Sequence, residues 1–195
     1  FLGMIPHDSP LGVLGFVNEV NSTRPLGLIV SVVEKNELDG EGYWFTKMVT
    51  PEEWRCKGVD HHLIEMEDFT AEVDIKASIE TIKKMRACIM AGNAVFIHCK
   101  AGRARSAMFC AIYLCLYVNN PETGKRYTFE EAIERLKDAR EQVKIGTEKQ
   151  AMGKAIYEQC LRDVALLEVA QYNPHAPESP PTNFDDFLGS KPLKD

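Results

Sequence analysis

One segment constrains this 195-residue chain more than any other, the run AVFIHCKAGRARSAMFCAIY at residues 94–113. Its first five residues predict a short buried strand, and residues 106–118 predict a buried helix, with a glycine-containing turn between them. At such a junction, several backbone N–H groups and the positive end of the helix dipole converge on one point. The segment therefore predicts an α/β fold with a site for an anion at the turn.

Apolar runs and helical periodicity alternate along the rest of the chain. Strands are predicted at residues 2–6, Leu26–Val33, 43–48, 61–66 and 94–98. Helices are predicted at residues 8–20, 51–57, 74–90, 106–118, 128–140 and 149–169, and Thr128 begins a capping box. This alternation predicts an α/β fold with a central mixed, parallel-rich sheet flanked by helices.

The pattern changes near the C-terminal end. Residues 171–195 hold five of the ten prolines and show little apolar periodicity. We therefore expect one domain over residues 1–170, followed by a flexible proline-rich tail over residues 171–195.

Composition excludes several classes of function. A net charge of −6 argues against a nucleic-acid partner, because such proteins usually display a basic face. The six cysteines include no Cys-x-x-Cys pair, and no His/Asp/Glu cluster has ligand spacing, so neither a metal nor another cofactor is expected. The longest near-apolar run has 13 residues and suits a buried helix better than a membrane span, and no targeting peptide is visible in the chain.

The turn itself carries the groups that phosphoryl chemistry needs. Cys99 and Arg105 stand in a Cys-x5-Arg spacing, which lets the guanidinium close the loop and point back at a bound anion. Loop amides, a helix N-terminus and a nearby cation lower the pKa of a thiol below its ordinary value of about 8.5. Cys99 is thus the candidate nucleophile; the alternative is a buried cysteine beside a surface arginine.

The run HCKAGRARS resembles the HCxxGxxR[ST] motif of the protein tyrosine phosphatase superfamily. The resemblance implies a cysteine-dependent phosphatase in which Cys99 forms a phosphocysteine intermediate and the Ser106 hydroxyl eases departure of the sulfur. It also implies that His98 orients the loop and that no metal or other cofactor takes part. The residues expected to bind the phosphate are Lys100, Ala101, Gly102, Arg103, Ala104 and Arg105.

This family takes the proton for the leaving group from an aspartic acid on a separate loop. Asp68 is the first candidate, because it follows the strand predicted at residues 61–66 and precedes Cys99 by a spacing usual for the smaller, dual-specificity members. Glu67 is the fallback acid. Asp74 is more simply the N-cap of the following helix.

Four segments resemble one subgroup, the mitochondrial phosphatases of the dual-specificity type that act on phosphatidylglycerophosphate. They are LGMIP, LIVSVV followed by Glu34 and Glu37, EDFT, and HCKAGRARS. The resemblance implies a phosphorylated lipid as substrate, peripheral contact with a membrane, and a place at the matrix side of the mitochondrial inner membrane; without it, the expected location is cytoplasmic. Lys100 and Arg103 suit a polyanionic head group.

Several alternatives stay open at this point. Glu34 and Glu37 either line the pocket or are solvated residues of a turn, and Lys100 and Arg103 are either substrate contacts or solvated charges. The alternative enzyme is a protein phosphatase for phosphotyrosine, phosphoserine or phosphothreonine. A phosphate-binding module without turnover is the alternative outside the enzymes, although Cys99, Asp68, Arg105 and Ser106 are all present.

Overall fold

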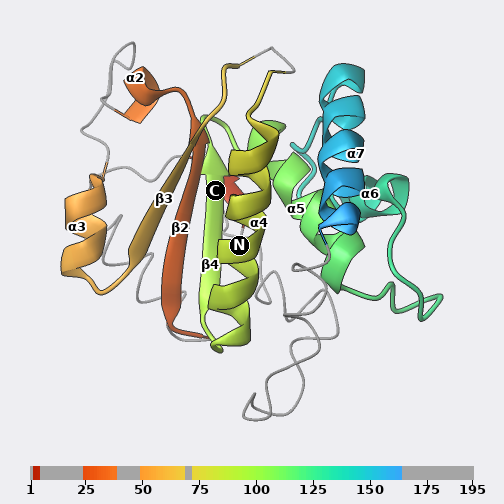
Figure 1. The fold of residues 1–195 in the computed structure, drawn as a ribbon, viewed down its shortest axis with the longest axis horizontal. Helices are drawn as coiled ribbons and strands as arrows, with labels where there is room; N and C mark the ends of the chain where they lie inside the picture. Colours follow the sequence, from red (N-terminus) through yellow and green to blue (C-terminus); the bar gives the residue numbers. More distant parts are fainter. Residues whose placement is uncertain (1, 5–23, 39–48, 69–71, 164–195) are drawn as a thin grey trace.

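A computed structural model describes residues 2–4, 24–38, 49–68 and 72–163. Four strands form one sheet in the order β1-β4-β2-β3, and every pairing in it is parallel (Figure 1). The strands are β1 (Leu2–Met4), β2 (Leu26–Val33), β3 (Asp60–Glu65) and β4 (Ala94–Cys99). The prediction of an α/β fold with a parallel-rich sheet is confirmed.

The helices agree closely with the sequence prediction. They are α2 (Lys35–Leu38), α3 (Pro51–Cys56), α4 (Ile75–Met90), α5 (Arg105–Tyr117), α6 (Phe129–Ala139) and α7 (Thr147–Arg162). Thr128 and Glu131 form the expected capping box, and Asp74 caps α4. The single turn α2 was not predicted. The strand predicted at residues 43–48, the helix predicted at residues 8–20 and the tail at residues 171–195 lie outside the described residues.

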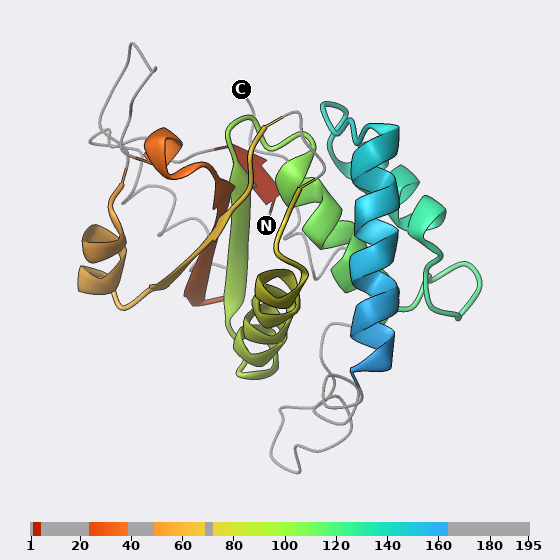
Figure 2. The ribbon, with the colours of Figure 1, turned by 45° about the horizontal axis from the view of Figure 1, so that its top comes forward.

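The helices form layers on the sheet (Figure 1, Figure 2). One face of the sheet packs against α4 and α5, and α6 and α7 cover α5 on its outer side. All thirteen residues of α5 are buried in consequence, which explains why its sequence is apolar on every side. On the opposite face, Trp54 of α3 packs with Ile29 and Phe96 in a smaller cluster.

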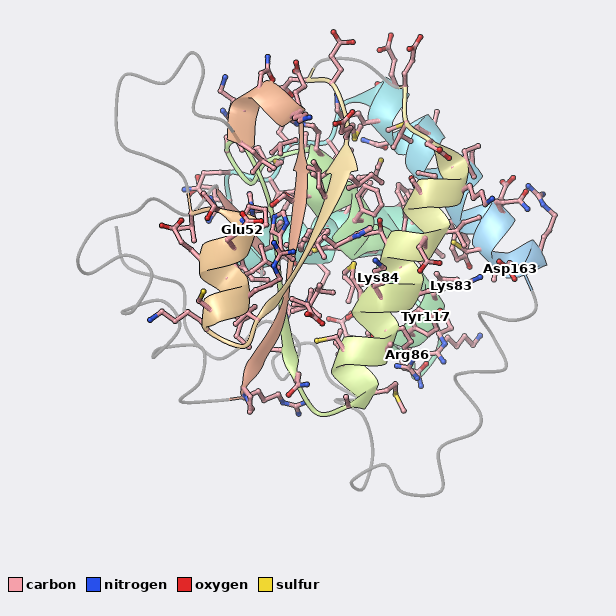
Figure 3. The ribbon with its side chains drawn as sticks, turned by 60° about the vertical axis from the view of Figure 1, so that its left-hand side comes forward. Glu52, Lys83, Lys84, Arg86, Tyr117 and Asp163 are labelled. Atoms are coloured by element: carbon pink, nitrogen blue, oxygen red, sulfur yellow. The ribbon has the colours of Figure 1, made fainter. Side chains whose placement is uncertain are left out.

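Polar contacts tie α4 to the helical layer (Figure 3). Lys83 forms an ion pair of 3.0 Å with Asp163, at the end of α7. The guanidinium of Arg86 lies 4.6 Å from the ring centre of Tyr117 in α5. These contacts fix the helices that frame the sheet, so the loop after β4 emerges from a rigid base.

The carboxyl ends of the strands define the functional end of the molecule. Here β2 leads into α2, and β4 leads into the loop that starts α5 (Figure 1). The N-terminal ends of α5 and α7 lie at this same end (Figure 1, Figure 2). In parallel α/β sheets, ligands bind outside the carboxyl ends of the strands, so this end is the place to look for a site.

Candidate active site

The loop between β4 and α5 places a sulfur atom at the start of a buried helix. Cys99 is the last residue of β4 and is only 3% exposed. Gly102 has a φ of +63°, a conformation that lets the chain turn back within five residues. Ala104, the N-cap of α5, has no side chain that could cap the first amides of the helix. The helix thus presents uncapped N–H groups to the loop interior.

The surroundings of Cys99 favour its thiolate. Burial by itself would raise the pKa of the thiol, but the Ser106 hydroxyl and amide, the charge of Arg105 and the Arg103 amide together lower it. The Ser106 hydroxyl donates a hydrogen bond of 3.2 Å to the sulfur. Burial raises the pKa of Cys110 and Cys115 to about 12. Cys99 is therefore set apart from these core cysteines by its polar contacts.

Arg105 is held in place by a carboxylate from another part of the chain. Its Nη1 and Nη2 atoms donate hydrogen bonds of 2.6 and 3.1 Å to Glu37 in α2, and Nη1 also donates to the Met66 carbonyl at 2.9 Å. The Arg105 side chain is 1% exposed and that of Glu37 is 8% exposed. Because Nη1 is fully used, the edge of the guanidinium that remains for an anion is the one formed by Nε and Nη2.

Glu34 and Glu37 contact Asp68 and Arg105 from outside the cleft. Glu37 also accepts the Glu34 amide at 2.9 Å, and the Glu34 carboxylate accepts the Asp68 amide at 3.1 Å. Neither glutamate is among the residues that line the cleft described below. Both were expected as possible pocket-lining residues; in the structure they connect α2 to Arg105 and to the segment that bears Asp68.

Asp68 lines the same cleft as Cys99. Its side chain is 29% exposed, and its Oδ2 lies 3.4 Å from Nη2 of Arg105. Asp68 and Cys99 both line the cleft, whereas Glu67 is exposed and does not line it. Asp74 accepts the Ala77 amide at 3.1 Å, as an N-cap does. The geometry thus brings together Asp68, Arg105 and Cys99.

A network of side-chain hydrogen bonds links three strands beneath the loop. The Ser31 hydroxyl in β2 lies 2.7 Å from Nε2 of His98 in β4 and 2.8 Å from Nε2 of His61 in β3. Burial lowers the pKa of His98 to about 3 and that of His61 to about 4, so both rings are neutral at pH 7. The single proton of the hydroxyl can be donated to only one of the two rings, so the Nε2 atom of the other ring must donate if both contacts are hydrogen bonds. This arrangement was not predicted, because Ser31 sits inside a run of apolar residues.

The loop opens into a cleft of about 710 Å³. Its lining residues are Asp68, Cys99, Lys100, Ala101, Arg103, Ala104, Arg105, Lys144, Gly146, Thr147, Glu148 and Lys149. Lys100 and Arg103 were predicted here, but Lys144 and Lys149 were not, since they lie 45 and 50 residues after Cys99. Over the described ranges, no group of three or more His, Cys, Asp or Glu side chains is arranged to hold a metal ion.

Residues 22–152 match the family model described as dual specificity phosphatase, catalytic domain. The matched region is more than half of the chain and contains all the site residues described above. The chain belongs to this family.

Two curated relatives match part of the chain. The chain is 25% identical over 118 residues to the phosphatidylglycerophosphate phosphatase PTPMT1 of Arabidopsis thaliana, covering 60% of this chain and 33% of that protein. It is 32% identical over 99 residues to the phosphatidylglycerophosphatase and protein-tyrosine phosphatase 1 of Mus musculus, covering 49% of this chain and 46% of that protein. The chain thus spans less than half the length of these relatives.

Solved structures share the fold. A crystal structure of PTPMT1 in complex with PI(5)P superposes with a TM-score of 0.64 at 21% identity, over 84% of this chain and 92% of that one. The structure of Tk-PTP in the active form gives a TM-score of 0.55 at 23% identity, over 73% and 84% of the two chains.

In the part of the chain that the structure describes, no helix is both long and apolar enough to cross a membrane.

Proposed function

We propose that this protein hydrolyses phosphate monoesters through a phosphocysteine intermediate. The observation that carries the proposal is the pairing of a thiol of lowered pKa, Cys99, with a buried guanidinium, Arg105, at the base of one cleft. Phosphoryl transfer needs positioning and stabilisation of charge more than covalent chemistry by the protein. The loop amides and Arg105 supply both.

The chemistry proceeds in two steps. The Cys99 thiolate attacks phosphorus while the bond to the ester oxygen breaks, and the carboxyl group of Asp68 gives its proton to the leaving alkoxide. Water then attacks the phosphocysteine, the Asp68 carboxylate takes a proton from that water, and the sulfur departs as a thiolate. The Ser106 hydroxyl, 3.2 Å from the sulfur, stabilises this thiolate. Arg105 and the amides of residues 100–105 hold the non-bridging oxygens throughout.

We propose phosphatidylglycerophosphate or a related phospholipid as the substrate. Both curated relatives carry the name of a phosphatidylglycerophosphate phosphatase, which supports a lipid substrate. The cleft is lined by five basic and two acidic side chains, although the chain as a whole has a net charge of −6. A polyanionic head group fits this local excess of positive charge better than a single phosphate does.

The same substrate gives the proposal a cellular setting. A phospholipid substrate requires peripheral contact with a membrane, and the resemblance of the catalytic segments to the mitochondrial subgroup suggests the matrix side of the inner mitochondrial membrane and a role in phospholipid biosynthesis. We further propose that residues 1–170 act as the catalytic domain and residues 171–195 as an appended tail. Immunogold labelling of cells that express the full-length protein would test the location, and even labelling of the cytoplasm would contradict it.

A direct comparison of substrates tests the proposed function. Purified protein is given phosphatidylglycerophosphate in mixed micelles and, separately, peptides with phosphotyrosine, phosphoserine or phosphothreonine, and released phosphate is measured. We expect kcat/KM to be at least about tenfold higher for the lipid, a difference of about 1.4 kcal/mol in transition-state binding. Equal or faster turnover of a peptide would replace the lipid by a phosphoprotein. Cys99→Ser serves as the inactive control.

A further inference from the structure

The cleft extends beyond the loop that holds the reacting phosphate. Its far wall is built by the connection between α6 and α7 and by the first turn of α7, residues 144–149. This wall carries Lys144, which is exposed, and Lys149, which is only 8% exposed. A buried lysine side chain beside a cleft holds its charge in a narrow range of positions, unlike a lysine that extends into solvent.

This wall is attached to the phosphate loop. The Lys144 amide donates a hydrogen bond of 2.9 Å to the Arg103 carbonyl, and Nε of Arg103 donates one of 3.2 Å to the Gln142 carbonyl. Val143 and Ile145 on either side of Lys144 are buried in the main core. The two walls of the cleft therefore keep a fixed separation, which a ligand with two anionic groups can exploit without ordering a loose segment.

The phosphate loop and its neighbours supply positive charge close to the reacting phosphate. Arg105 is paired with Glu37, and Lys100 lies 3.9 Å from the same carboxylate. The amides of residues 100–105 face the loop interior and serve one phosphate group. Lys144 and Lys149 line the part of the cleft formed by residues 144–149, and Glu148 is the acidic residue of that part. They add positive charge where the rest of a substrate, rather than its reacting phosphate, would lie.

We propose that Lys144 and Lys149 form a second anion subsite, which binds a non-reacting phosphate on the same molecule as the phosphate that is cleaved. The inference rests on the proposed function and deepens it, since it makes a compound with two phosphate groups the preferred substrate class. In a glycerophospholipid that bears a terminal phosphomonoester, the group in this subsite is the phosphodiester that links the head group to the lipid. Lys144 and Lys149 thereby determine specificity and take no part in bond cleavage.

Small soluble probes test the subsite without a lipid. Glycerol 1,3-bisphosphate and glycerol 3-phosphate are compared as competitive inhibitors of the hydrolysis of p-nitrophenyl phosphate. We expect the bisphosphate to bind the parent protein at least about tenfold more tightly than the monophosphate. In the double variant Lys144→Gln, Lys149→Met, the ratio of the two inhibition constants should fall to within about twofold of unity. Methionine at position 149 keeps the length of the buried stem.

Matched controls separate the subsite from general effects of charge or folding. Lys154→Gln removes a cation from α7 outside the cleft, where the side chain pairs with Glu130, and it should leave the ratio as in the parent. Each ratio is measured within one variant, so a uniform loss of active protein cancels. A bisphosphate preference that is absent from the parent, or that survives the double substitution, would overturn the inference.

The two proposals fail in different ways. If the parent shows the bisphosphate preference but does not hydrolyse phosphatidylglycerophosphate, the proposed lipid substrate is wrong and the subsite stands. If the parent hydrolyses that lipid and the double variant keeps the same ratio of kcat/KM for the lipid over p-nitrophenyl phosphate, the lipid substrate stands. The subsite is then wrong.

Discussion

Replacement of Glu37 by glutamine tests how Arg105 is held. The carboxylate accepts two hydrogen bonds from Arg105, at 2.6 and 3.1 Å, and both side chains are almost fully buried. Burial would raise the pKa of Glu37, but the hydrogen bonds from Arg105 and the Glu34 amide and the charges of Arg105 and Lys100 lower it. At neutral pH, Glu37→Gln therefore removes a full negative charge and leaves a nearly isosteric side chain.

The expected cost follows from the bonds that are lost. Removal of one partner of a buried ion pair destabilises a protein by about 3–5 kcal/mol, and one hydrogen bond to a charged group contributes about 1.5–3 kcal/mol. The glutamine oxygen keeps one of the two bonds to Arg105, and Asp68 remains 3.4 Å from Nη2. We therefore expect a loss of about 2–3 kcal/mol, which shifts the melting temperature of a chain of this size by roughly 5–10 °C.

Activity should fall further than stability alone explains. Without its anchor, the guanidinium no longer presents the Nε–Nη2 edge in a fixed orientation, and the loss of one preorganised donor typically costs a factor of about 10²–10³ in kcat. Urea unfolding gives the stability, and p-nitrophenyl phosphate hydrolysis at 20 °C gives kcat. Glu52→Gln, which removes a carboxylate from an exposed ion pair with Arg55, is the control and should change stability by less than about 0.5 kcal/mol. A Glu37→Gln protein as stable and as active as the parent would refute the reasoning.

Three further changes probe other parts of the site. Iodoacetamide should alkylate Cys99 in a Cys56→Ser background with an apparent pKa below that of an ordinary thiol, because contacts with Ser106 and Arg105 lower the pKa of this thiol. Cys110 and Cys115, whose pKa burial raises to about 12, should stay unmodified by mass spectrometry. An ordinary thiol titration at Cys99 would contradict the account. Asp68→Ala should lower kcat by a factor of about 10²–10⁴ for an alkyl phosphate and much less for p-nitrophenyl phosphate, whose leaving group needs no proton. Equal losses of kcat for the two substrates would show that another residue is the acid. On account of His98, the free energy of unfolding should decrease by about 1.4 kcal/mol per pH unit as the pH falls from 6.5 towards 5. The reason is that the unfolded chain binds a proton at His98 in this range, whereas the folded chain, in which the pKa of His98 is about 3, does not. Urea titrations should show a shallower slope of this free energy against pH for His98→Asn, and an unchanged slope would show that His98 is not the group responsible.

The fold was largely predictable because its signals are local. The apolar run Leu26–Val33, the capping box at Thr128 and the helical periodicity that ends at Gly92 each specify one element without reference to the rest of the chain. Gly92 has a φ of +82°, as expected of the residue that stops a helix. The turn α2 was missed because four residues, KNEL, carry no periodicity, and its position depends on contacts made elsewhere.

The candidate site was likewise predictable where its signals are local and not where it depends on distant contacts. Cys99, Arg105 and Ser106 were predicted together because they fall within eight consecutive residues, and their spacing alone determines their geometry. The partners of these residues come from distant segments: Glu37 holds Arg105, Ser31 lies against His98, and the Lys144 amide meets the Arg103 carbonyl. A sequence pattern does not show contacts between residues 40 to 70 positions apart. Glu37 was expected as a possible pocket-lining residue because it follows a buried strand at the carboxyl end of the sheet, but its contact with Arg105 was not predicted.

The phosphate loop and the wall at residues 144–149 differ in how strongly the rest of the fold constrains them, and this affects how substrate specificity can change. The side chains proposed to act on the phosphate lie mainly on β4 and α5, where Glu37 and the hydrogen-bond network of Ser31 hold them in place. Substitutions there therefore disturb buried hydrogen bonds and ion pairs. The connection between α6 and α7 contacts the phosphate loop through two hydrogen bonds, from the Lys144 amide to the Arg103 carbonyl and from Nε of Arg103 to the Gln142 carbonyl, and Lys144 and Gly146 of this connection line the cleft. Apart from the buried Ile145, the side chains at residues 144–149 can therefore vary with little disturbance of the phosphate loop. We infer that substrate preference is set on this wall, while the phosphate loop remains common to every substrate the cleft accepts.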